Sequence, residues 1–330
     1  MTIARPITAR NVRHVALTVV FGVVCSSACT PDPGYGGRSS DQWIAALADP
    51  DPTVRADAAS ALGHVLELQP RFPRVVDALI ETLSDTSDMV RIAAAYALAL
   101  SQRARSPAAV PGIIAALKDS AHSDVRQQAA FVLGLLGEKG AAAVPSLAAA
   151  TRDPSPSVRA EAAGALGRIG PSATLAAPEM ARLSQDPDAS VRLRAVEALL
   201  NIRPPVSQAL PILTRALGDS AASVRMAAAY ALGSLKEGAA PATNDLLARL
   251  SDPDPTVRTA AAFALGEIGP PAALALSKLT ELANGDSSES VRQQATDAIE
   301  GVQGTRDSPR TPREPTQLEK CASGDRSPRC

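Results

Sequence analysis

The sequence predicts an all-α protein, built as a solenoid of about eight helix–turn–helix units. Three observations support this prediction: the amino-acid composition, a dipeptide that recurs along the chain, and an apolar stripe with helical spacing. Of the 330 residues, 45% are hydrophobic but only 2% are aromatic. The half-buried strands of a β-sandwich or barrel favour aromatic and β-branched side chains, so helices rich in Ala and Leu are expected instead.

The recurring dipeptide is Val-Arg, which divides most of the chain into eight units with a period of about 33 residues. Its valines are Val54, Val90, Val125, Val158, Val191, Val224, Val257 and Val291. A unit of this length buries its apolar face only against its neighbours. The array therefore predicts a solenoid.

The second helix of each unit begins just before this valine. Asp or Ser three residues earlier is a typical N-cap, and Pro52, Pro156 and Pro255 stand at the first helical position. Four residues after the valine every unit has Ala, and eight residues after it Leu or Ile, so this stripe is the expected core face. Five units have Gly one position further on. These glycines either relieve contact with the next helix or ease the end of their own.

A shorter apolar helix precedes each second helix, for example over residues 145–150 and 211–217. Proline opens these segments, and the sequence predicts it in their first turn, where its missing N–H is tolerated. The prolines concerned are Pro111, Pro145, Pro178 and Pro211. Each unit is thus a helix, a turn and a second helix.

The repeated pattern, DPxxxVRxxAAxALGxxG around Asp252–Gly269, resembles HEAT repeats of the phycobilisome-lyase-like kind. The resemblance covers residues 41–303 and implies a right-handed α–α superhelix. It also implies an Asp/Arg ladder, in which each Arg bonds the turn of its own or the neighbouring repeat. Because it recurs in every unit, this ladder is expected to serve stacking rather than anion binding. Its residues include Asp153, Arg159, Asp186, Arg192, Asp219, Arg225, Asp252 and Arg258.

Residues 1–28 are expected to be a signal peptide. Three arginines and no acidic residue precede the apolar run 15–24, which is too short to span a bilayer but matches a secretory core. The stretch Cys25–Cys29 resembles the lipobox of bacterial lipoproteins, which implies lipidation of Cys29 and a place in the cell envelope, facing the periplasm. Soluble secretion after cleavage at Ala28 and an uncleaved anchor remain as alternatives.

Two segments flank the repeats. Residues 29–40 are rich in Pro, Gly and Ser and are expected to form a flexible tether, and residues 304–330, rich in Pro, Ser and Arg, a disordered tail. All four cysteines lie in these flanks or the signal, so the repeats need no disulfide and hold no cysteine-based zinc site. Cys321 and Cys330 either close a small loop or remain free thiols.

The positions that vary between units are the candidates for partner binding. Six residues after the valine stand Tyr96, Phe131, Tyr230 and Phe263, four of the seven Phe and Tyr residues. In HEAT arrays the second helices line the concave surface, so the resemblance implies aromatic anchors for a protein or peptide there. The alternative is that these rings fill grooves between successive helices. Companions on the same face are Gln128, Glu161, Arg194, His64 and Arg168.

Catalysis and nucleic-acid binding find little support. Between signal and tail, acidic residues outnumber basic ones by about six, which does not attract phosphate backbones. One HEAT-like enzyme, deoxyhypusine hydroxylase, holds iron through His–Glu motifs, which this chain lacks. Phosphate loops and hydrolase motifs are also missing. We therefore expect a monomeric binding scaffold without cofactor or metal. The alternatives are an enzyme or accessory subunit of the bilin-lyase type, and self-association through the solenoid ends.

Overall fold

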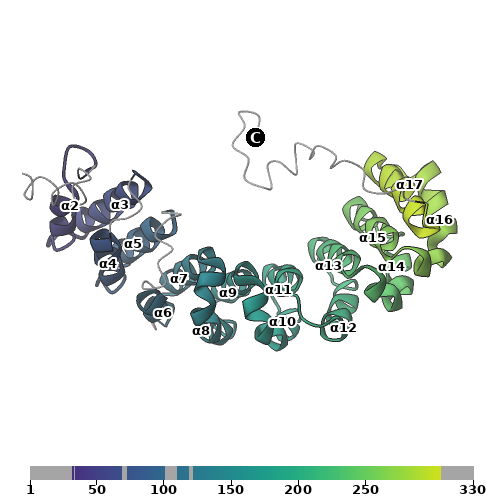
Figure 1. Cartoon of the computed structure of the whole chain (residues 1–330), viewed down its shortest axis with the longest axis horizontal. Helices are drawn as coiled ribbons and strands as arrows, with labels where there is room; N and C mark the ends of the chain where they lie inside the picture. The colour runs from purple at the N-terminus through teal and green to yellow at the C-terminus, as the bar shows by residue number, and fades with distance from the viewer. Residues whose placement is uncertain (1–31, 33, 69–72, 101–109, 119–121, 306–330) are drawn as a thin grey trace, which may run out of the picture.

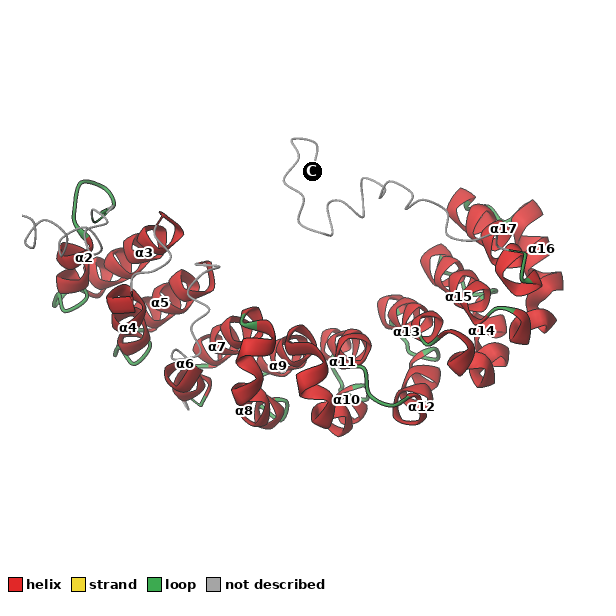
Figure 2. Ribbon diagram, viewed as in Figure 1, coloured by secondary structure: helices red, strands yellow, loops and turns green. Residues whose placement is uncertain are grey.

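The computed structural model describes residues 32, 34–68, 73–100, 110–118 and 122–305. Figure 1 shows a curved row of helix pairs, and Figure 2 shows that its regular structure is helical. Within those ranges the only β-type pairing is a single bridge between Tyr35 and Arg38. The predicted all-α solenoid is confirmed, while its right-handedness stays a prediction.

Each pair has a first helix on the outer side of the curve and a second helix on the inner, concave side (Figure 1). The first helices are α2 (Ser40–Ala46), α4 (Pro73–Thr82), α6 (Val110–Leu117), α8 (Val144–Ala150), α10 (Ala177–Leu183), α12 (Val206–Ala216), α14 (Thr243–Arg249) and α16 (Leu276–Gly285). The second helices are α3 (Pro52–Leu68), α5 (Asp88–Leu100), α7 (Ser123–Leu135), α9 (Pro156–Ile169), α11 (Ala189–Ile202), α13 (Ala222–Ser234), α15 (Pro255–Ile268) and α17 (Glu289–Gln303).

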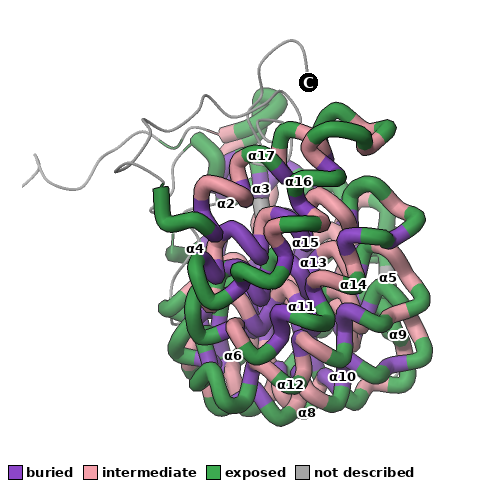
Figure 3. Tube along the Cα trace, turned by 90° about the vertical axis from the view of Figure 1, so that its right-hand side faces the viewer, coloured by how far each residue is buried: buried purple, intermediate pink, exposed green. Residues whose placement is uncertain are grey.

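The core lies between these two layers. Ala58 and Leu62 and their counterparts in every unit are buried, except that the last counterpart, Ile299, is partly exposed. Figure 3 shows the buried segments running through the middle of the array, with exposed turns around them. The expected apolar stripe therefore faces the core.

The glycines of the second helices permit close stacking of the repeats. A Cβ on Gly63 would lie 2.9 Å from the Cβ of Ala97 in the next second helix, and one on Gly167 would lie 3.1 Å from the Cα of Ala198. These glycines thus relieve helix contact, one of the two roles considered for them. Two other glycines, Gly170 and Gly269, stand at the ends of second helices. Their φ of 78° suits a residue without Cβ.

Short 3-10 helices connect several units, and the sequence pattern did not predict them. They are η2 (Gly137–Ala143), η3 (Gly170–Ala176), η4 (Lys236–Ala242) and η5 (Pro270–Ala275). Each follows a second helix and contacts the second helix of the next unit.

The connection between the fifth and sixth units differs. Arg203 adopts a left-handed conformation, φ 49°, two prolines follow, and α12 begins at Val206. The prediction for Pro211 was wrong, because this proline lies inside α12 rather than in its first turn. Residues 206–210 form additional helix where other units have a 3-10 segment. Pro145 and Pro178 do lie in the first turns of α8 and α10.

The N-terminal flank folds back onto the first repeat. The Asp32 carboxylate accepts a hydrogen bond from the Ser40 N–H at 2.7 Å, and the Trp43 indole donates to the Tyr35 carbonyl at 2.9 Å. The Tyr35 ring stacks on His64 in α3, with ring centroids 4.6 Å apart. Residues 34–39 of the expected flexible tether are therefore a turn that caps the array, because backbone and ring contacts hold them.

The signal region and most of the tail fall outside the described residues, and with them Cys29, Cys321 and Cys330. None of the helices that the structure describes combines the length and apolar character needed to cross a membrane. The repeats run from Ser40 to Gln303, close to the expected 41–303.

Candidate functional site: the concave face and its supporting ladder

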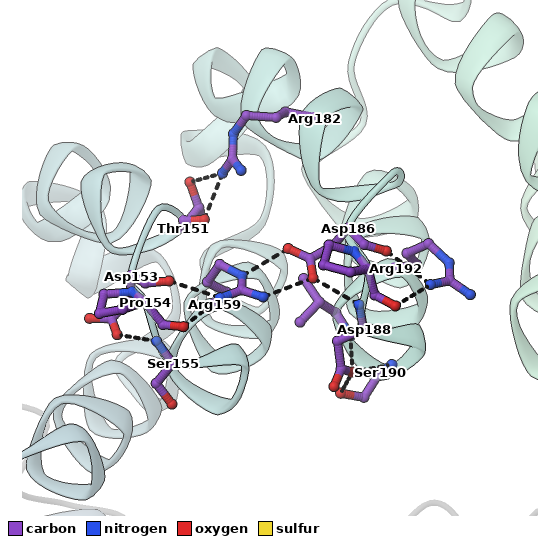
Figure 4. A network of polar contacts seen from close by, with 12 residues as sticks. Thr151, Asp153, Pro154, Ser155, Arg159, Arg182, Asp186, Asp188, Ser190 and Arg192 are labelled. Atoms are coloured by element: carbon purple, nitrogen blue, oxygen red, sulfur yellow. Dashed lines mark hydrogen bonds and ion pairs between the residues drawn. The ribbon is translucent and has the colours of Figure 1, made fainter.

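A ladder of arginines and aspartates joins the turns of successive repeats. Arg159 donates from Nε and Nη2 to the two carboxylate oxygens of Asp186 in the next unit, at 2.8 and 2.9 Å, and from Nη1 to the Asp153 carbonyl at 2.9 Å (Figure 4). Arg159 therefore bonds both the neighbouring turn and its own. The same bidentate pairing joins Arg55 to Asp85, Arg126 to Asp153, Arg192 to Asp219, Arg225 to Asp252 and Arg258 to Asp286.

The ladder aspartates also shape the start of the second helices. Asp186 accepts the backbone N–H of Asp188 at 3.0 Å, and Asp188 in turn caps α11 by accepting the Ser190 N–H at 2.8 Å. Ser155 stands at the N-cap of α9, where its hydroxyl bonds the Ser157 hydroxyl at 2.8 Å and caps no backbone N–H. Six repeats thus use one aspartate both to close the turn and to receive the preceding arginine: Asp85, Asp153, Asp186, Asp219, Asp252 and Asp286.

Electrostatics keep the ladder ionised. Burial alone would raise the pKa of the Asp186 carboxyl, but hydrogen bonds from Arg159 and from the Asp188 N–H hold it below the ordinary 3.8. The Asp186 carboxyl likewise raises the pKa of Arg159. Only 13% of the arginine side chain and 5% of the aspartate side chain are exposed. The guanidinium is already engaged on both sides, which favours a stacking role over anion binding.

The aromatic column divides into exposed tyrosines and partly buried phenylalanines. Tyr96 on α5 is 54% exposed and Tyr230 on α13 is 37% exposed. Phe263 on α15 contacts Tyr230, with ring centroids 5.3 Å apart and the planes tilted by 52°. Phe131 on α7 lies under the Arg168 guanidinium at 5.2 Å and packs against the core. The phenylalanines fill grooves between helices, while the tyrosines present surface.

The polar companions lie mainly on the middle units. Arg168 donates to Glu161, both on α9, and so connects Phe131 to a carboxylate. Arg194 and Glu197 pair at 3.0 Å on α11. Gln128 is partly buried on α7, and His64 stacks with Tyr35 instead of facing the middle units.

Sequence reasoning did not select three acidic residues of this surface: Glu197, Glu267 and Asp297. They stand at the same variable positions, six or ten residues after the valine, as the residues that were chosen. Comparing charge along those columns would have found them.

The described part of the chain contains no cluster of three or more His, Cys, Asp or Glu residues placed to hold a metal ion. The residues named on this surface offer rings, an amide and paired charges. Such groups recognise other molecules by packing and hydrogen bonding.

An elongated stack of helix pairs with a continuous inner face defines an α-solenoid repeat scaffold. Residues 40–134, 110–179, 176–243 and 238–300 match the HEAT-repeat family, so the chain belongs to the HEAT-repeat proteins. No curated protein matches this sequence.

Two similar solved structures share the fold. An engineered protein superposes with a TM-score of 0.59 at 22% identity, covering 80% of this chain and 78% of its own. The YibA protein of Escherichia coli gives a TM-score of 0.58 at 22% identity, over 82% of this chain and 93% of its own. The complex of CpcE and CpcF of phycocyanin lyase from Nostoc sp. PCC7120 gives 0.43 at 23% identity, over 82% and 97%.

Proposed function

We propose that this protein is an exported, lipid-anchored scaffold that binds another protein or peptide on its concave face. The observation that carries the proposal is the pair of exposed rings, Tyr96 and Tyr230, on two inner helices of the solenoid. Tyrosine combines a large apolar face with a hydroxyl, and it is enriched among residues that dominate binding energy.

The scaffold around these rings favours binding because its helices are ordered before a partner arrives. Successive second helices contact each other through small residues, and bidentate ladder pairs join the turns of neighbouring units. A surface that is ordered before binding loses less conformational entropy when it forms a complex. An extended concave surface is also how repeat proteins commonly bind partners.

The test is capture of an envelope protein by two matched variants. Tyr96→Ala with Tyr230→Ala should reduce capture at least tenfold while the melting temperature stays within a few degrees. The control is Leu175→Ala with Leu274→Ala, which removes two leucines that are 90% and 54% exposed on η3 and η5 rather than on second helices. Equal capture by wild type and the tyrosine variant would contradict the proposal.

A different outcome would favour the bilin-lyase alternative. Addition of an open-chain tetrapyrrole to the purified protein should leave its absorbance spectrum unchanged if the protein is only a scaffold. A shifted spectrum that persists in the double tyrosine variant would indicate chromophore handling outside the aromatic column.

Lipid anchoring rests on the stretch that ends at Cys29. Cys29→Ala should move the protein from the membrane fraction to the soluble fraction of a bacterial host and abolish incorporation of labelled fatty acid. Labelling that persists in this variant would contradict the proposal.

We also expect a monomer, because both ends of the array are capped. On α17, Thr296 and Glu300 replace the small residues Ala262 and Gly266 found at the same positions of α15. The turn over residues 34–39 covers the other end. Terminal repeats with polar outer faces resist stacking, and sedimentation equilibrium should return the mass of one chain.

A further inference from the structure

The two long edges of the array differ in their side chains. Each unit is a first helix, a ladder turn and a second helix, so the ladder turns lie along one edge and the connections between units along the other. Along this other edge η2 contacts η3, and η4 contacts η5. We call it the connector edge. Within the part of the chain that the structure describes, it consists of residues 34–39, 136–143, 170–176, 203–205, 235–242 and 269–275, with Leu68 and Val206 at adjoining helix ends.

Exposed apolar side chains gather on the connector edge. Leu175 on η3 is 90% exposed and Leu274 on η5 is 54% exposed. Both stand seventeen residues after the valine of their unit, and three other units have an exposed, uncharged residue there: Ala142, Gln208 and Pro241. Tyr35, Leu68 and Val206 add further exposed apolar surface to the same edge. Grouped apolar surface of this kind marks contact with a protein or a membrane.

Charged residues are sparse where the exposed leucines lie. Residues 170–176 and 269–275 contain none, whereas every unit places at least an aspartate and an arginine on the ladder edge. Between the two leucine segments, Arg203 and Lys236 are exposed, with Glu237 beside them. Long basic side chains at such positions reach phospholipid head groups while their stems cover apolar surface. Because charges are costly to move out of water, the connector edge is the side that a lipid surface favours.

The N-terminal chain enters the array at this edge. The turn over residues 34–39 leads directly into α2, and only Thr30 and Pro31 separate Asp32 from Cys29 in the sequence. A lipid on Cys29 therefore brings the connector edge, rather than the ladder edge, next to the bilayer. The Tyr35 and Trp43 rings lie in and beside this turn, and tyrosine and tryptophan are enriched where a membrane meets water.

We infer that the connector edge rests on the bilayer that holds the proposed lipid of Cys29. Leu175 and Leu274 enter the head-group region, and Arg203 and Lys236 lie toward the phosphates. Figure 1 shows most helices nearly end-on, so this edge faces one way along the arc and is shaped to meet a flat surface. The inference rests on the proposed function, because it takes the lipid anchor as given. It adds the orientation of the array, in which the concave face stands upright on the membrane and stays open to partners.

Flotation with lipid vesicles tests the edge without the anchor. Residues 30–330 contain every residue that the structure describes and lack both the expected signal and Cys29. We expect this chain to bind vesicles of phosphatidylethanolamine and phosphatidylglycerol. Leu175→Glu with Leu274→Glu should weaken the partition by about tenfold or more, because two exposed leucines no longer leave water.

Met89→Glu is the matched control for an added charge. Met89 is 46% exposed but lies at the ladder edge, near the start of α5, so the change should alter the partition by less than about twofold. Thermal melts of the three chains should agree within a few degrees, because the substituted side chains are exposed.

Hydrogen exchange reports which edge the lipidated full chain turns toward the membrane. Compared with residues 30–330 in solution, the chain in vesicles should exchange the connections 170–176 and 269–275 about tenfold more slowly. The ladder turn over residues 185–190 should exchange at the same rate in both states.

Several results would overturn the inference: no vesicle binding by residues 30–330, binding unchanged by the two glutamates, or connections that exchange in vesicles as fast as in solution. Protection that needs another envelope protein and is absent with lipid alone would also overturn it. Fatty-acid labelling of Cys29 reports on the anchor separately. A labelled chain with unprotected connections refutes the edge alone, whereas vesicle binding by residues 30–330 supports the edge even where labelling fails.

Discussion

At the scale of single residues, the ladder arginine can join two repeats, as Arg159 shows. Arg159 bonds the carboxylate of Asp186 in one unit and two backbone carbonyls of its own turn, those of Asp153 and Pro154. Most of both side chains is shielded from water. Removing one partner strands the other charge away from solvent, which costs far more than the net value of the pair.

Asp186→Ala should therefore lower the free energy of unfolding by about 3 kcal/mol. Glu197→Ala is the matched control, since it breaks the Arg194–Glu197 pair, whose side chains are 51% and 41% exposed. That change should cost less than about 1 kcal/mol. Urea denaturation followed by circular dichroism measures both losses in the free energy of unfolding. A comparable loss in the two variants would show that the ladder pair contributes no more to stability than an exposed ion pair.

The ladder also predicts a direction for acid sensitivity. The pKa values of Asp85, Asp153, Asp186, Asp219, Asp252 and Asp286 all lie below the ordinary 3.8 in the folded protein. Carboxyls with a lowered folded pKa contribute stability that is fully present above the unfolded pKa and is lost as the pH falls through the folded pKa.

Stability should thus stay level down to about pH 5 and fall below about pH 4. Asp186→Asn should be less stable than the wild type at neutral pH. The difference in their free energies of unfolding should become smaller in acid, because the variant has no carboxylate to protonate at that position. Urea midpoints across this pH range measure the difference, and a difference that stays constant would mean that Asp186 does not contribute to the loss of stability in acid.

At the scale of helices, the small residues of the second helices set the distance between repeats. Gly63→Leu should destabilise the protein by about 1–3 kcal/mol, because even a Cβ there lies 3.0 Å from the Cα of Ala97. Gly285→Ala is the control, since a Cβ at that position meets nothing within 4 Å. Thermal melts compare the two, and a tolerated leucine would show that adjacent repeats separate easily.

At the scale of helices, some features could be predicted from the sequence and others could not. The starts of second helices were predictable because Asp, Ser and Pro mark them, and the apolar stripe followed from helical spacing. The 3-10 connections were not, because a stretch such as Gly137–Ala143 has no apolar periodicity and its shape depends on contact with the next repeat. The aromatic column was found, but which rings are exposed depends on neighbours such as Arg168 over Phe131.

At the scale of the whole molecule, the array is not uniform. The fifth unit has Leu200 where five of the other second helices have the contact glycine, and it is followed by Arg203 and two prolines instead of a 3-10 helix. Helices α11 and α13 accordingly contact each other less closely than α9 and α11 do. In a solenoid, stability is a sum over neighbouring interfaces, so this junction is one of two weak ones, because α5 and α7 contact each other no more closely.

Breaking the ladder at that junction should let the array unfold as two separate blocks of repeats. Arg192→Ala, which removes the bond to Asp219, should give two urea transitions, one for units one to five and one for units six to eight. Arg159→Ala, within the first block, should shift stability without splitting the transition. Hydrogen exchange resolved by segment follows the unfolding of each block. A single transition shared by all units in Arg192→Ala would contradict the separate unfolding of two blocks.

The turn that packs on the first repeat has a geometric consequence for the proposed anchor. With Cys29 held in a membrane, only five peptide steps separate the lipid from Gly34, whose N–H bonds the Asp32 carboxylate that also accepts the Ser40 N–H of the first repeat. At about 3.3–3.6 Å per residue, this connecting segment is no longer than about 18 Å. The solenoid would therefore stand close to the bilayer surface, and partners would approach it there rather than across the full depth of the compartment.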